Sequence, residues 1–144
     1  MKIDISTRSL RAMKRHAGRD YPHECCGFLV GREGPGGRGG RRIAIEEALP
    51  AENLNRERAH DRYEISPLAY LKLEESLQGT GRGILGYYHS HPDHPSRPSE
   101  TDLTMFGGWP GYVYVIVGVD GKTAKSKRYT VTAWSLEEHE LVSV

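Results

Sequence analysis

The sequence has 144 residues and lacks several features that would assign it to a special class of protein. Only two cysteines occur, and these are the neighbours Cys25 and Cys26. Neighbouring cysteines rarely pair with each other, so a disulfide framework is excluded. No apolar stretch approaches the ~18 residues of a transmembrane helix, and residues 1–6 lack the apolar core of a signal peptide. We therefore expect no membrane partner and a cytoplasmic location.

An excess of charge of one sign is also missing. Lysine and arginine total 20, and aspartate and glutamate total 19, which gives a net charge of +1. A domain that binds nucleic acid is usually clearly basic, so we expect no nucleic-acid partner. The hydrophobic share of 37% and the charged share of 27% are ordinary for a globular chain. The length suits a single domain, residues 1–144, that can bury a sizeable core.

Short apolar runs separated by turn residues predict more strands than helices. Residues 112–119 form the longest apolar run and should be a central strand. The glycine-rich residues 34–40 cannot pack in a core, and we expect them to form a mobile hairpin loop. The other predicted strands cover residues 2–5, 26–31, 41–49, 83–91, 126–134 and 138–144.

Three helices are predicted from their capping residues. Ser6 is a suitable N-cap for a helix that reaches about residue 17, where Gly18 would end it. Ser66, followed by proline, starts a second helix that should end near residue 78, and Ser99 starts a third of about two turns. Because strands outnumber helices and several neighbouring strands read as hairpins, the expected fold class is α+β, a mixed α/β/α sandwich.

Histidines and a carboxylate follow one another closely between residues 89 and 102. His89 and His91 are two positions apart, so on a strand they point to the same face, roughly 7 Å apart at the backbone. Pro92 ends the hydrogen-bonded pairing of this strand. The carboxylate of Asp102, in the first turn of the next helix, can turn back toward the two histidines. Two histidines and one carboxylate leave a tetrahedral zinc ion one open position, which is typical of a catalytic site. Such an ion lowers the pKa of its water toward ~7.

The same residues also have a purely structural interpretation. Two histidines spaced in this way are a weak signal and could be hydrogen-bonded surface residues. The residues 99–102 have the form of a capping box, with Ser99 as the cap and Asp102 at the third helical position. The two interpretations are compatible, because a capping serine can also direct its hydroxyl group at a substrate.

The motif as a whole resembles the signature of a known family. The pattern His89-x-His91-Pro92-x6-Ser99-x-x-Asp102 is similar to that of the JAMM (MPN-plus) metalloproteases. Glu24, at the start of the run ECCGFLVG, resembles the glutamate of that family at its first core strand. The resemblance covers nearly the whole chain and implies an MPN-like central mixed sheet flanked by helices. It is strongest to the short prokaryotic branch, which includes sulfur-carrier–cysteine peptidases and ubiquitin-like-protein proteases.

The resemblance implies a role for each residue of the motif. His89, His91 and Asp102 would hold one Zn²⁺, although manganese, iron or cobalt could bind the same ligands. Glu24 would be the general base, a choice that depends on the resemblance alone. Ser99 would help to hold the oxyanion of the tetrahedral intermediate. The expected activity is that of a zinc-dependent peptidase or isopeptidase. Its substrate would be an amide bond at the C-terminus of a small ubiquitin-like or sulfur-carrier protein.

Two other functions remain as alternatives. A non-catalytic scaffold of the MPN type would lack metal ligands, whereas every matching position is filled in this sequence. A DNA-repair-associated protein resembling the RadC group would carry a similar run of histidines, serine and aspartate. The near-neutral charge and the strand that begins after Glu24 favour the peptidase branch.

Further residues around the motif carry weaker expectations. Residues 53–64 resemble the first variable insertion of the family, and we expect them to help hold an extended tail that docks as an added strand. Cys25 and Cys26 are interpreted as small buried packing residues, with a zinc-ligand or redox role as the alternative. His16, His60 and His139 are expected on the surface.

Overall fold

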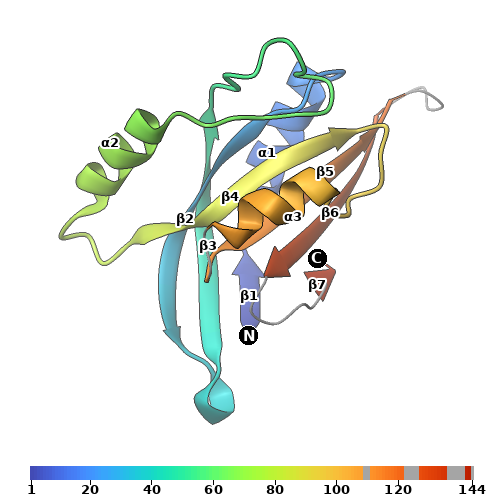
Figure 1. Ribbon diagram of the computed structural model, residues 1–144. Helices are drawn as coiled ribbons and strands as arrows, with labels where there is room; N and C mark the ends of the chain where they lie inside the picture. Colours follow the sequence, from blue (N-terminus) through green and yellow to red (C-terminus); the bar gives the residue numbers. More distant parts are fainter. Residues whose placement is uncertain (109–110, 122–126, 136–141, 144) are drawn as a thin grey trace.

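One mixed sheet runs through the computed structural model, which describes residues 1–108, 111–121, 127–135 and 142–143 (Figure 1). The strand order is β1-β3-β2-β4-β5-β6-β7. The strands are β1 (Lys2–Ile5), β2 (Cys26–Pro35), β3 (Arg41–Ala51), β4 (Gly83–Pro92), β5 (Val113–Asp120), β6 (Arg128–Ser135) and β7 (Val142–Ser143). The helices are α1 (Thr7–Asp20), α2 (Pro67–Leu77) and α3 (Glu100–Gly107), with a short 3₁₀ turn at Gly37–Gly39.

Helices cover both faces of this sheet (Figure 1). β1 pairs with β3 and β4 pairs with β5 in parallel, while the other neighbouring strands are antiparallel. Met13 and Ala17 of α1 pack with Leu29 in the larger core cluster, whereas α2 packs against Phe28 on the other face. Neighbouring residues of β2 therefore point to opposite faces, as in any strand. The predicted α+β class with a mixed sheet is confirmed.

The ends of several elements differ from the prediction. α1 continues through Gly18 to Asp20, so the prediction that Gly18 ends the helix is wrong. A Cβ atom at this position would overlap the Tyr129 hydroxyl group, so the glycine serves close packing. The helix stops at Tyr21 instead, because the residue before a proline avoids helical conformation.

The glycine-rich hairpin is shorter than predicted. β2 pairs with β3 as far as Pro35 opposite Arg41, so the connection comprises only residues 36–40. Backbone hydrogen bonds, which do not require side chains, continue the ladder there, and Nε of Arg41 also donates to Oε1 of Glu33 at 2.6 Å. The mobility of this hairpin stays a prediction. The strand predicted over 138–144 falls mostly outside the described residues, and only β7 pairs with β6 there.

The ladder between β2 and β4 brings the motif residues together. Cys26 lies opposite His89, and the backbone N–H of Ser90 donates to the carbonyl oxygen of Cys25 at 3.0 Å. Tyr88 is fully buried on the α1 face, while Tyr87 packs with the α2 cluster on the other face. His89 and His91 share the face of Tyr87 by alternation. None of the three described helices has the length and hydrophobicity that crossing a membrane would require.

Candidate metal centre

Three side-chain atoms from β4 and α3 meet at one point. The Nε2 atoms of His89 and His91 are 3.1 Å apart, and the Asp102 Oδ2 atom lies 3.2 Å and 3.0 Å from them. Ligand atoms on a tetrahedral zinc ion, each about 2.0–2.2 Å from the metal, lie roughly 3.3–3.6 Å from one another. The observed triangle is only slightly smaller than this. The residues therefore fit a zinc ion with small side-chain movements.

The surroundings of the two Nδ1 atoms leave the Nε2 atoms of His89 and His91 facing Asp102. Nδ1 of His91 lies 2.8 Å from the carbonyl oxygen of Pro95, which can only accept, so Nδ1 carries a proton. In the neutral ring, the lone pair of Nε2 then points toward Oδ2 of Asp102, 3.0 Å away. The lone pairs of these two atoms repel each other unless a cation lies between them. Nδ1 of His89 is buried without a partner among the described residues. That ring makes its polar contacts through Nε2.

Aromatic side chains hold the first of these histidines in place. The His89 side chain has no exposed surface, and the Tyr63 ring stacks on it at 4.5 Å with an interplanar angle of 23°. Phe106 of α3 adds an edge contact at 6.5 Å. No motif in the sequence points to Tyr63, although it is the only tyrosine in the polar segment that precedes α2. The stacking restricts the ring of His89 to one orientation.

Asp102 both caps a helix and points at the histidines. The Ser99 backbone N–H donates to Oδ2 of Asp102 at 2.9 Å, and the Asp102 N–H donates to the Ser99 Oγ at 3.0 Å. This is the predicted capping box at the start of α3. The oxygen that accepts from Ser99 is also the one nearest to both histidines, so the capping role leaves Asp102 in a position compatible with a metal-ligand role.

The charges of the cluster suit a cation. Burial raises the pKa of Asp102, but hydrogen bonds from His89 and His91 outweigh this and hold the pKa well below its usual range. For His91, burial lowers the pKa, yet the hydrogen bonds to Asp102 and Pro95 leave it raised. The pKa of His89 is lowered, chiefly by burial. Without a metal, a proton on His91 balances the carboxylate, and a divalent ion would replace that proton.

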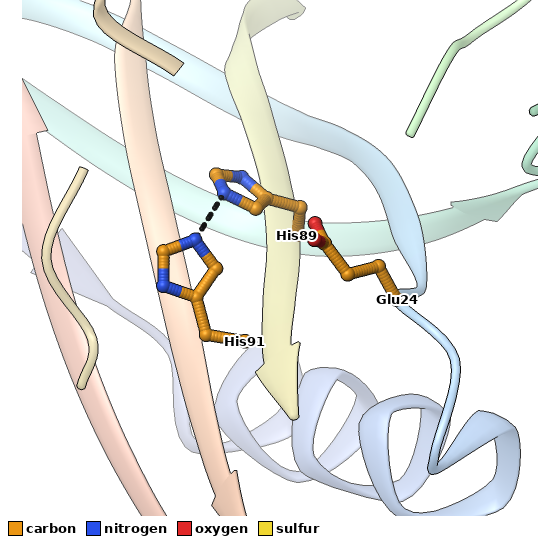
Figure 2. Close-up of side chains that lie close together, drawn as sticks. All are labelled: Glu24, His89 and His91. Carbon is orange, nitrogen blue, oxygen red and sulfur yellow. Dashed lines mark hydrogen bonds between the residues drawn. The ribbon is translucent and has the colours of Figure 1, made fainter. Parts of the chain in front are cut away.

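Glu24 lies beside the histidines at the start of β2 (Figure 2). Its carboxylate and the two rings each offer one ligand atom within 4.8 Å of the others. The side chain is only 6% exposed, and burial raises its pKa to about 8, with a further rise from the charge of Asp102. A carboxyl group with a pKa near neutrality is suited to accept and return a proton.

Among the described residues, the cysteines and the other histidines contribute no ligand atom to this cluster. Cys25 and Cys26 are at most 1% exposed, and burial raises the pKa of each thiol to about 12, in agreement with their interpretation as packing residues. His60 is exposed as predicted, and His139 lies outside the described residues. His16 is buried, so its prediction as a surface residue is wrong. It lies on the inner face of α1, where Nδ1 is 2.7 Å from the Tyr88 hydroxyl group.

An apolar groove of about 460 Å³ lies next to the site. Tyr63 lines it, and the same ring stacks on His89, so one side chain lies between the groove and the histidine cluster. Its other lining residues come from the segment before α2, from α2 itself, and from β4, α3 and β5. They include Ile65, Tyr70, Leu71, Tyr87 and Met105.

Sequence comparison assigns the chain to a family. The family described as prokaryotic homologues of the JAB domain matches residues 6–137. The chain belongs to this Prok-JAB family. The resemblance to JAMM proteins predicted from the motif is thereby confirmed.

Several Prok-JAB relatives have peptidase names. A desampylase of Haloferax volcanii is 33% identical over 144 residues, covering 100% of this chain and 93% of the relative. A probable TtuB-protein conjugate cleaving protease of Thermus thermophilus is 38% identical, over 80% of this chain and 69% of the relative. A CysO-cysteine peptidase of Mycobacterium tuberculosis is 32% identical, over 75% of this chain and 67% of the relative.

The fold of the Prok-JAB chain agrees with a solved structure. A JAB1/MPN domain protein from Archaeoglobus fulgidus has a TM-score of 0.55 at 20% identity, covering 100% of this chain and 96% of that protein. This likeness concerns the fold alone, and it confirms the expected MPN-like arrangement of a mixed sheet with helices.

Proposed function

We propose that this chain is a zinc-dependent peptidase or isopeptidase of the JAMM type. Its substrate is an amide bond at the C-terminus of a small ubiquitin-like or sulfur-carrier protein. The observation that carries the proposal is the meeting of two ring nitrogens and a carboxylate oxygen within 3.0–3.2 Å, with Glu24 beside them. The names of the relatives, which include a protein-conjugate cleaving protease and a CysO-cysteine peptidase, support the substrate class.

Each side chain of the site has a distinct part in this proposal. His89, His91 and Asp102 would hold the zinc ion, which when bound would supply Lewis acidity toward a water molecule and the scissile carbonyl group. Glu24 takes up a proton from the attacking water and returns it to the leaving nitrogen, for which its raised pKa suits it. The hydroxyl group of Ser99 donates a hydrogen bond to the oxygen that gains negative charge.

The apolar groove is the proposed path of the substrate tail. An extended tail adds backbone hydrogen bonds along its length, and small residues at its end fit a narrow approach to the metal. Deleting residues 53–62 is expected to raise KM. The structure shows that this segment also holds the backbone of Glu24, so we expect kcat to fall as well. Substitutions in the groove itself are therefore a cleaner test.

The leaving group is identified by mass spectrometry of the products. The protein is incubated with three conjugates of one candidate carrier protein, which end in a cysteine, in a lysine side-chain linkage or in a linear peptide. We expect cleavage of at least one conjugate after the last residue of the carrier, and a chelator should stop it. The Glu24→Gln variant should keep its zinc and lose turnover. Undiminished turnover in this variant would refute the base role.

The alternative functions give different results in the same experiments. A scaffold of the MPN type would contain no zinc and cleave no conjugate. A RadC-like protein would shift a DNA probe with an affinity that falls steeply as salt is raised. No feature of the described residues favours either alternative over the peptidase.

A further inference from the structure

One asparagine in the segment between β3 and α2 uses its full hydrogen-bonding capacity. Nδ2 of Asn53 donates to the carbonyl oxygens of Glu24 at 3.2 Å and Arg62 at 3.0 Å. Its Oδ1 accepts from the backbone N–H groups of Asn55 at 3.0 Å and Glu64 at 3.1 Å. An asparagine side chain can donate two hydrogen bonds and accept two, so this one is saturated. It is therefore held in one orientation by four backbone groups.

Glu24 depends on this segment for its backbone position. It precedes β2, which begins at Cys26, so its own peptide groups lie outside the paired part of that strand. Its carbonyl oxygen accepts from Asn53, and its N–H group donates to the carbonyl oxygen of Ala59 at 2.5 Å. Both backbone hydrogen bonds of Glu24 are thus made with residues 53–59.

The same asparagine also fixes the residue that covers a metal ligand. Its bonds to Arg62 and Glu64 lie on either side of Tyr63 in the chain. The Tyr63 ring stacks on His89 at 4.5 Å and is buried. One side chain therefore connects the peptide that carries Glu24 to the peptide that carries the ring on His89.

We propose that Asn53 is a positioning residue that sets the place of Glu24 relative to the metal-ligand histidines. This inference rests on the proposed function, in which Glu24 moves the proton. A proton-transfer group works only within hydrogen-bond reach of its target. A displacement of about 1 Å is enough to cost on the order of 100-fold in rate. All four hydrogen bonds of the Asn53 side chain go to backbone groups of this chain, so Asn53 acts through Glu24.

The test compares two asparagines of the same segment. Asn53→Ala removes the contact to Glu24, whereas Asn55→Ala removes only a side-chain bond to the Arg58 N–H. We expect kcat of Asn53→Ala to fall on the order of 10- to 100-fold, with a smaller change in KM and with full zinc content. Asn55→Ala should have kcat within about twofold of the wild type. Asn53→Asp, which keeps the acceptor and loses both donors, should behave like Asn53→Ala.

Amide hydrogen exchange provides a readout that needs no activity. In the metal-free protein, we expect the Glu24 amide to exchange faster in Asn53→Ala and to be unchanged in Asn55→Ala. Unchanged exchange, a normal kcat, or a raised KM with normal kcat in Asn53→Ala would overturn the inference. If instead the wild type cleaves no conjugate, or Glu24→Gln cleaves as well as the wild type, the proposed function fails and the positioning role fails with it.

Discussion

Single atoms and their partners decide the chemistry at this site. The carbonyl oxygen of Pro95 fixes the proton of His91 on Nδ1, and so leaves Nε2 available. The same Oδ2 atom of Asp102 accepts from the Ser99 N–H and faces both ring nitrogens. Such outer contacts orient metal ligands and raise their basicity. The geometry of the site therefore depends on hydrogen bonds to backbone groups, which a sequence motif does not predict.

The buried carboxyl group of Glu24 gives a prediction about stability and pH. Without metal, its pKa rises from 4.5 to about 8 on folding, so between these values the folded protein binds a proton that the unfolded chain has lost. The contribution of Glu24 to stability is therefore complete below pH 4.5 and falls as the pH rises toward 8, by at most about 1.4 kcal/mol per pH unit.

The test is urea unfolding of the chelated protein between pH 5 and 8. Glu24→Gln removes the titrating group, so we expect its stability relative to the wild type to increase steadily with pH. Titrating groups far from Glu24 cancel in this difference, whereas the pKa of His91, which the charge of Glu24 raises, changes with the substitution. If the free energies of unfolding of the two proteins depend on pH in the same way, burial does not raise the pKa of Glu24.

A close approach at Gly27 gives a second prediction at the residue scale. A Cβ atom there would overlap the Tyr88 ring and the Leu49 carbonyl oxygen, and the latter is backbone that cannot move aside. We expect Gly27→Ala to lower the free energy of unfolding by about 2 kcal/mol or more. Gly34→Ala is the control, because a Cβ atom there meets nothing within 4 Å. Equal stabilities in the denaturant series would contradict the packing described here.

At the scale of elements, α3 combines a cap and a candidate oxyanion donor in one residue. Ser99→Gly should cost only a few tenths of a kcal/mol in helix capping, whereas Ser99→Ala should cost about 1 kcal/mol. Both variants lose the hydroxyl group, so we expect kcat to fall on the order of 100- to 1,000-fold in both. If the serine serves only as a cap, the activity of Ser99→Gly will stay close to that of the wild type.

Helix α2 offers a matched pair of leucines for testing the groove. Leu71 is 52% exposed and lines the groove, while Leu68 is 58% exposed on the same helix and lies outside it. A charge on the groove wall has to be desolvated when an apolar tail binds. We expect Leu71→Glu to raise KM by about tenfold or more with unchanged kcat, and Leu68→Glu to leave both values near the wild type. Equal effects on KM would place the tail elsewhere.

Most helices and strands could be predicted from the sequence, and the errors in their predicted ends have physical causes. Ser6, Ser66 and Ser99 all cap helices as predicted, because a capping side chain acts on its own chain neighbours. Gly18 misled the prediction because its role is contact with Tyr129, a residue far away in the sequence. The loop of the hairpin was predicted too long because a strand ladder continues through glycines when its partner strand is present.

At the scale of the whole molecule, the site exists only through long-range pairing. His89 and His91 could be recognised from their spacing, and Asp102 from its place in a helix. The choice of Glu24 needed the family resemblance, because only the pairing of β2 with β4 brings it to the histidines. Asn53 and Tyr63 lie in an irregular segment that has no periodic pattern, so their contacts could not be predicted from the sequence.

The central claim is that His89, His91 and Asp102 together hold one zinc ion. Anomalous diffraction at the zinc absorption edge, from crystals of the zinc-loaded protein, tests it most directly. We expect a single strong peak about 2.0–2.2 Å from Nε2 of each histidine and from a carboxylate oxygen of Asp102. No peak at these atoms, or a peak bound by other residues, would contradict the account.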